Sequence, residues 1–141
     1  MVLLAGLAFL LTVGAQEAPA VTVKQVLDTR ARAVEARDLD GVRRSYSQSP
    51  DMVVFRPGAA YRGWNEYRAY WERALPGVPD GFRIDWHDDV VVHVASNEII
   101  VASLTWSTDG GGSRAQQGRI TVVLRREGGR FVIAHEHLSG S

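Results

Sequence analysis

The chain changes its hydrophobic period once, after Pro79, and this change restricts the possible folds more than any other feature. Before Pro79, apolar residues recur mostly at three- and four-residue steps, the period of a helix with one buried face. After Pro79, apolar and polar residues alternate, which is the period of β-strands. Because the strand segments are joined by short connections, neighbouring strands should be antiparallel. The sequence therefore predicts an α+β fold, in which helices pack on one side of a curved antiparallel sheet.

Turn and capping residues divide the chain into its expected elements. Three helices are predicted, beginning at Val21, at Leu39 and near Trp64. The segment 38–41 ends the first helix and caps the second, and Pro76 with Gly77 stops the third. One short strand is expected before the third helix and four strands after it, at residues 52–55, 82–95, 98–107, 119–126 and 131–138.

Composition narrows the class of protein. With 141 residues, 45% of them hydrophobic, the chain has enough apolar content for one domain with a single core. It contains no cysteine, which excludes a disulfide scaffold and a lipid-anchored lipoprotein. Its formal net charge is 0, and its aromatic residues do not alternate with basic ones, so we expect no nucleic-acid partner.

The amino-terminal end has the features of an export signal. Residues 2–13 are twelve uncharged, mostly apolar residues, fewer than the roughly 20 that a membrane-spanning helix needs. They fit a secretory hydrophobic region, and the small residues at 13–15 suit cleavage before Gln16. We expect a signal peptide at 1–15, a linker at 16–20 and one domain at 21–141. The mature protein would then be secreted or periplasmic and would have no membrane attachment.

Two segments resemble a known family. One runs from Phe55 through Gly63 to Glu72, and the other covers residues 121–140 and includes a His-x-His-x-Ser sequence that begins at His135. In this order and spacing they resemble the SnoaL-like domains of the nuclear transport factor 2-like superfamily. They are also similar to the association domain of calcium/calmodulin-dependent kinase II. The resemblance covers about residues 21–140 and implies a cone-shaped fold with a pocket between the helices and the concave face of the sheet.

Alternation sorts the strand residues into two faces, and the resemblance suggests which face lines the pocket. On the last strand, Glu136 and Leu138 lie on one face, and His135 and His137 lie on the other. The pocket arginines of the kinase domain align with Ser103, Thr121 and Leu138, which implies that the Glu136 face lines the pocket. The opposite face would then be covered by a second subunit in a homodimer, through Ala102, Leu104, Trp106, Ile120, Val122 and Leu124.

Glu136 and Arg119 are the charged candidates, and both are expected to project into the cone from neighbouring strands. A carboxylate in an apolar cavity has a raised pKa and can transfer protons, so Glu136 is the candidate catalytic residue. An arginine beside it lowers that pKa and can bind an anion, so Arg119 is the candidate ligand anchor. The alternative is a structural ion pair that shapes the pocket.

The remaining ligand-binding candidates are Arg56, Tyr67, Trp71, Ser103 and Thr121. Arg56 stands near the position of the catalytic Asp in ketosteroid isomerases, which is evidence against isomerase chemistry, because arginine is no base at neutral pH. The alternative for Arg56 is a solvent-facing position at the rim. Tyr67 and Trp71, one helical turn apart, would form an aromatic wall, although this spacing is also typical of ordinary core residues.

Other chemistry is not indicated by the sequence. His135 and His137 share a strand face, and His93 is a conceivable third ligand, but their spacing does not predict a metal site. There is no glycine-rich phosphate loop followed by lysine, no serine nucleophile elbow and no cysteine nucleophile. The acidic segment 85–89, which contains one histidine, is interpreted as a solvated strand end. We therefore expect no cofactor and no metal.

Three functions are consistent with these features. The first is a binding protein whose pocket holds a small organic ligand, such as an organic anion. The second is a lyase, isomerase or cyclase in which Glu136 transfers the proton. The third is an oligomerisation module, like the kinase association domain. A bonded pair between Glu136 and Arg119 would favour binding or a structural role, and a buried Glu136 with no cation nearby would favour the enzyme.

Overall fold

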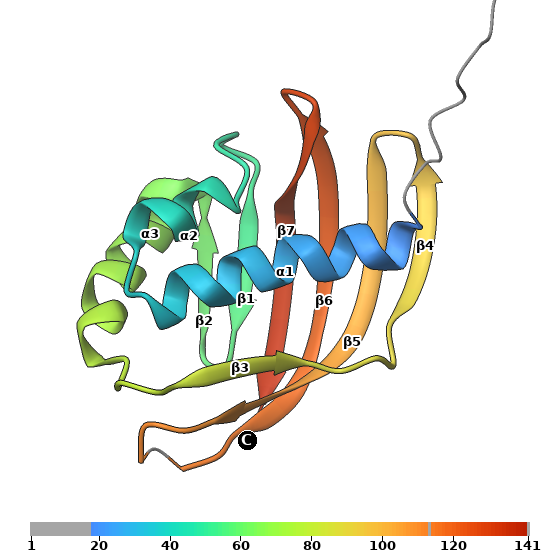
Figure 1. The fold of residues 1–141 in the computed structure, drawn as a ribbon. Coiled ribbons are helices and arrows are strands. Elements are labelled where there is room, and N and C mark those ends of the chain that lie inside the picture. Colours follow the sequence, from blue (N-terminus) through green and yellow to red (C-terminus); the bar gives the residue numbers. More distant parts are fainter. Residues whose placement is uncertain (1–17, 113, 141) are drawn as a thin grey trace, which may run out of the picture.

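The computed structural model describes residues 18–112 and 114–140 (Figure 1). The predicted signal peptide lies outside these residues, as do the first two residues of the predicted linker. The helices are α1 (Pro19–Glu35), α2 (Leu39–Arg44) and α3 (Gly63–Ala74), followed by the short 3-10 helix η1 (Leu75–Gly77). The strands are β1 (Val53–Arg56), β2 (Ala59–Arg62), β3 (Arg83–Trp86), β4 (Val91–Ser96), β5 (Ile99–Asp109), β6 (Gln117–Glu127) and β7 (Arg130–Gly140).

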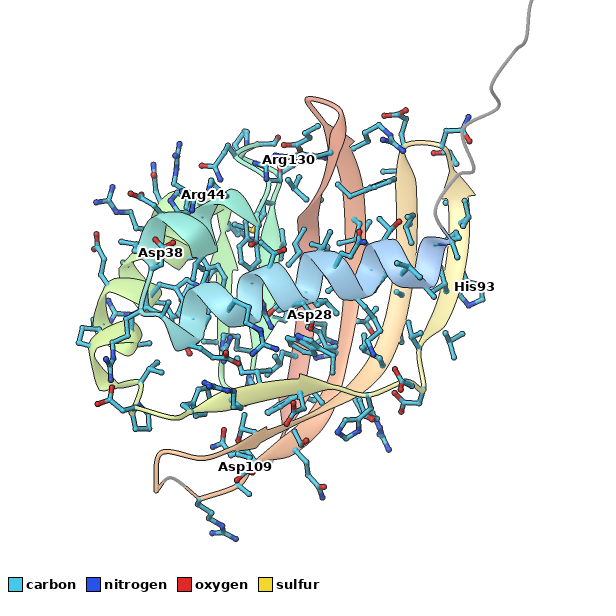
Figure 2. The ribbon with its side chains drawn as sticks, viewed as in Figure 1. Asp28, Asp38, Arg44, His93, Asp109 and Arg130 are labelled. Carbon is cyan, nitrogen blue, oxygen red and sulfur yellow. The ribbon has the colours of Figure 1, made fainter. Side chains whose placement is uncertain are left out.

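The three predicted helices are confirmed. Helix α1 begins at Pro19, inside the predicted linker. Proline suits this position because N–H groups in the first turn have no partner within the helix, so its missing N–H costs nothing, and because its fixed φ is helical. Helix α2 begins after Asp38, whose side chain accepts a hydrogen bond from the Gly41 N–H. Figure 2 shows Asp38 at this junction between α1 and α2. No helix within the described residues is long and apolar enough to cross a membrane.

The seven strands form one curved sheet in the order β2-β1-β7-β6-β5-β3, and β4 also pairs with β5. The pairs are antiparallel except for β1 and β7, which run parallel. Helix α1 crosses one face of this sheet, and α2 and α3 cover its β1–β2 end (Figure 1). The α+β architecture is therefore confirmed, and it places the helices over the concave face.

Two strand predictions need correction. The single strand expected at 82–95 is two strands, β3 and β4, which pair with different halves of β5. Between β3 and β4, the Asp89 carboxylate accepts a hydrogen bond from the Thr105 N–H of β5 at 2.9 Å. A side chain thus takes the place of the backbone carbonyl that a paired strand would offer to Thr105. Strand β2 was not expected. It forms because Gly58, at φ 74°, turns the chain back onto β1.

Glu136 and Leu138 of β7 face inward as predicted, but the predicted faces of β5 and β6 are reversed. Ile120, Val122 and Leu124 are fully buried and belong to the same core as residues of α1. Val122 pairs with Glu136 across β6 and β7, so both side chains lie on the inner face. The chain's own helices cover this apolar face of the sheet. Its side chains are therefore already removed from water within one subunit, which is favourable. The homodimer stays a prediction, and its contact surface must lie elsewhere.

Candidate functional site

A buried ion pair joins the first helix to the last strand. The Nη1 atom of Arg30, on α1, donates to both carboxylate oxygens of Glu136, on β7, at 2.9 and 2.8 Å. Tyr46 completes the group, since its hydroxyl donates to Glu136 at 2.7 Å and accepts from Arg30 at 2.8 Å. The side chains of Arg30 and Glu136 are 3% and 0% exposed. Each charge is therefore neutralised inside the protein and not by solvent.

The electrostatics of the site keep Arg30 charged and Tyr46 protonated. Burial lowers the pKa of Arg30, but the attraction of Glu136 together with the interactions of Tyr46 and Tyr67 outweighs it and leaves the pKa above its ordinary value. Burial raises the pKa of Tyr46 well above its usual range, although Arg30 opposes the shift. Arg30 is thus a permanent cation, and Tyr46 is a permanent hydrogen-bond donor to Glu136.

Arg56 is a second internal cation and has a different environment. It lies at the end of β1, donates to the Tyr67 hydroxyl at 3.1 Å, and has its guanidinium 4.7 Å from the ring centre of Tyr70 and 5.7 Å from that of Trp71. Burial lowers the pKa of Arg56, but the neighbouring tyrosines and Glu136 raise it above the ordinary value. Within the described residues, Arg56 forms no ion pair with a carboxylate.

Arg30 and Arg56 both line one cavity of about 200 Å³ between α1, α3 and the strands. The rest of its wall is mainly apolar and aromatic, and consists of Val34, Tyr70, Trp71, Ala74, Val78, Phe82, Ile84, Trp86, Trp106, Thr108, Gln116 and Leu138. An adjoining hollow of about 420 Å³ shares Arg56, Tyr70, Trp106, Gln116 and Leu138 with this cavity. The shared residues place Arg56 at the boundary between the two spaces.

Several hydrogen-bond donors around the cavity have no acceptor in the described protein. They are the Nε of Arg30 and the indole nitrogens of Trp71, Trp86 and Trp106, and all four residues line the cavity. A buried donor without a partner costs about 1–3 kcal/mol. Such groups are few in a native protein, and their concentration here indicates a cavity that suits a molecule with acceptor atoms.

The family follows from the sequence. The profile of the SnoaL-like domain matches residues 23–141. The chain belongs to the SnoaL-like domain family. No curated protein matches this SnoaL-like chain in sequence.

Solved structures confirm the nuclear transport factor 2-like fold of this SnoaL-like protein. A nuclear transport factor 2-like protein of unknown function from Pseudomonas putida is 27% identical, with a TM-score of 0.70, over 86% of this chain and 87% of that one. A similar protein from Shewanella oneidensis is 20% identical, with a TM-score of 0.72, over 86% and 99% of the two chains. A superfamily protein from Salmonella enterica is 17% identical, with a TM-score of 0.73, over 86% and 90%.

The structure brings together three of the predicted site residues of the SnoaL-like protein, with Glu136 close enough to act on the pKa of Arg56 and Tyr67. Arg56, Tyr67 and Trp71 are in contact with one another. Trp71 and Arg56 line the cavity, whereas Tyr67 is fully buried behind them. Burial raises the pKa of Tyr67 to about 12, so that its hydroxyl stays protonated next to Arg56. Of the pair predicted to form an aromatic wall, Trp71 lines the cavity and Tyr67 does not, and Tyr70 is the second aromatic residue of α3 in the wall.

Arg119, Ser103 and Thr121 lie on the outer face of the sheet, and their predicted orientation into the cone is wrong. Ser103 and Thr121 share a hydrogen bond of 2.8 Å between their hydroxyls. Because Ile120 and Val122 point into the core, the residues that alternate with them on β6 point outward. Glu136 therefore has Arg30 as its partner and not Arg119.

Arg30 was missed by the sequence analysis, although the sequence contains a signal for it. Val23, Leu27, Arg30 and Val34 follow one another at steps of four, three and four residues, which places all four on one helical face. All four are buried. A charged residue within an apolar stripe indicates a buried partner of opposite charge on another element.

The structure does not bring together the three histidines considered as metal ligands. His135 and His137 lie on the outer face of β7, beside Phe55. His93 lies on β4, at the far edge of the sheet (Figure 2), with β5 and β6 between it and β7. Among the described residues, no group of three or more His, Cys, Asp or Glu side chains is arranged to hold a metal ion.

Proposed function

We propose that this SnoaL-like protein binds a small organic anion in the cavity between α1, α3 and the inner face of the sheet. The charge balance at the cavity is the observation that carries this proposal. Arg30 is neutralised by Glu136, with which it forms a direct ion pair. Arg56 contacts phenol and indole rings, and among the described residues no carboxylate bonds to it, although the charge of Glu136 acts on it without a direct contact. One positive charge is thus left over in a partly desolvated site, where a carboxylate would form charge-assisted hydrogen bonds with the guanidinium.

The unpaired donors support the same chemistry. The indole N–H groups of Trp71, Trp86 and Trp106 can donate only, and they need acceptor oxygens. The aromatic wall suits an apolar body on the same ligand. We therefore favour an aromatic or aliphatic carboxylate of a size that fits about 200 Å³.

The contacts of Glu136 favour binding over the proposed enzyme alternative. Its oxygens accept from Arg30 and Tyr46, and it is 0% exposed. Glu136 is also not among the residues that line the cavity. A general base must reach the proton that it removes, so we assign Glu136 to holding Arg30 in place.

Calorimetric titration with a panel of aromatic and aliphatic carboxylates tests the proposal. Replacing Arg56 with Ala removes the charge-assisted contact and should weaken binding by about 1.5–3 kcal/mol, or roughly 10- to 150-fold. Arg68→Ala is the matched control, since Arg68 lies on the exposed side of α3 and pairs with Glu72 at 2.7 Å. Binding that is equal in the two variants, or no binding by any carboxylate, would contradict the proposal.

A further inference from the structure

Four side chains on the outer face of the sheet form one continuous chain of hydrogen bonds. The Thr105 hydroxyl donates to Asp89 Oδ2 at 2.8 Å. His87 Nδ1 lies 2.7 Å from the same Thr105 hydroxyl oxygen, and His87 Nε2 lies 3.0 Å from the Ser107 hydroxyl. The turn between β3 and β4 supplies Asp89 and His87, and β5 supplies Thr105 and Ser107.

The direction of these hydrogen bonds follows from Asp89. Hydrogen bonds from the Thr105 backbone and side chain lower the pKa of Asp89, so its carboxylate is ionised and only accepts. Thr105 therefore gives its hydroxyl proton to Asp89 and accepts from His87 Nδ1. With the proton on Nδ1, His87 Nε2 has a free lone pair, which accepts the proton of Ser107. This is the arrangement that activates a serine hydroxyl as a nucleophile.

A hollow of about 520 Å³ lies next to this chain of hydrogen bonds. It is lined by His87 and Thr105 and by two polar residues of β6, Gln117 and Arg119. Gln117 is the cross-strand partner of Ser107, and Arg119 is the partner of Thr105. Directly paired residues of one face are neighbours in a sheet, so the Gln117 amide lies beside Ser107 and the Arg119 guanidinium lies beside Thr105. Ser107 is partly exposed and lies next to the hollow, but it is not among the residues that line it. The amide and the guanidinium are both donors that can stabilise a developing oxyanion.

We propose that Ser107 is a nucleophile that accepts acyl groups from small carboxylic esters, with His87 as its base. The Ser107 oxygen attacks the ester carbonyl while its proton passes to His87 Nε2. The carbon–oxygen bond to the alcohol breaks, and the departing alcohol takes the proton from His87. Water then gives a proton to His87 and attacks the carbonyl of the acyl-serine. The bond to the Ser107 oxygen breaks, the carboxylic acid leaves, and Ser107 takes the proton back from His87. This site lies on the opposite face from the cavity and does not depend on anion binding there.

Acylation with p-nitrophenyl acetate tests the proposal on the whole protein. The reaction is quenched with acid before water can release the acyl group. The expected result is release of p-nitrophenol together with one acetyl group, located on Ser107 by peptide mass spectrometry. Ser107→Ala should abolish the labelling, and His87→Gln should slow it by about 100-fold or more. Ser103→Ala is the matched control, because Ser103 lies on the same strand face but bonds to Thr121. No acetyl group on Ser107, or equal labelling in the His87 variant, would overturn the proposal.

Thr105 is a positioning residue, and its role has a spectroscopic signature. In the native protein, ¹⁵N chemical shifts should place the proton of neutral His87 on Nδ1. Thr105→Val removes the acceptor and should shift the population towards the Nε2–H tautomer and slow acylation, while circular dichroism stays unchanged. A native His87 already in the Nε2–H form would refute the mechanism, because Nε2 would then have no lone pair for the serine proton.

Discussion

Replacing Glu136 with Gln tests the role of the buried ion pair most directly. The change keeps the shape of the side chain and removes its charge, so Arg30 is left as an unpaired cation that is 3% exposed. At 2.8 Å and an effective dielectric constant of about 20, the lost attraction is about 6 kcal/mol. The amide oxygen still accepts one hydrogen bond, and Glu136 itself no longer has to be desolvated. We therefore expect the free energy of unfolding to fall by about 3–5 kcal/mol.

Urea denaturation followed by tryptophan fluorescence measures this loss. With an m-value of about 1.5 kcal/mol per M, the midpoint should fall by about 2–3 M. Glu72→Gln is the control, since it breaks the exposed pair between Arg68 and Glu72 and should cost less than about 1 kcal/mol. Equal losses in the two variants would refute our interpretation that the buried pair dominates.

The same variant also separates the two functions considered for Glu136. If Glu136 only holds Arg30, the freed Arg30 adds a second unpaired positive charge at the cavity, and the Glu136→Gln protein should bind carboxylates more tightly. If Glu136 transfers a proton in a reaction, the variant should instead lose turnover. Weaker carboxylate binding by the folded variant would argue against the charge balance on which the proposed function rests.

Three further outcomes are expected. Ile120→Asp should unfold the protein and not merely dissociate a dimer, because Ile120 is fully buried in the core of its own subunit; circular dichroism and sedimentation distinguish these results. Hydrogen bonds from Arg125 and Ser49 lower the pKa of Asp51 to about 2 from its ordinary 3.8. The stability that Asp51 contributes is therefore present above about pH 4 and lost as pH falls towards 2, and acid denaturation of Asp51→Asn should lack this loss. In a bacterium with export machinery, the mature protein should begin near Gln16; an intact amino terminus in the cytoplasm would contradict this.

Periodicity was sufficient for most of the fold. The helices and the long strands follow from the spacing of apolar residues, because each element must place its apolar side chains on the face that is buried. Strand β2 was not predicted, because its hairpin depends on the positive φ of Gly58 and not on a hydrophobic pattern. The break between β3 and β4 depends on a side-chain contact from Asp89 to a residue on another strand. Contacts of that kind are specified in three dimensions and leave no period in the sequence.

The site was predicted only in part, for a related reason. The aromatic face of α3 follows from helical spacing. Arg56 was a candidate only through the resemblance, as the residue near the position of the catalytic Asp in ketosteroid isomerases. The partner of Glu136 did not follow, since the alternation on β7 gives two faces and does not say which one the helices cover. The apolar residues Ile120 and Val122 favoured the correct face, and the resemblance to the kinase domain led to the opposite choice.

The ion pair between the first helix and the last strand also has a consequence for how the chain folds. Arg30 and Glu136 are 106 residues apart in sequence, and the strand that carries Glu136 pairs in parallel with β1, which precedes the third helix. Contacts of this range are slow to form, because the loop entropy must be lost before they stabilise anything. During synthesis, the charge on Arg30 remains without its counter-ion until β7, which carries Glu136, has also been made. We therefore expect the docking of β7 to be the late, rate-limiting event that commits the domain to its native state.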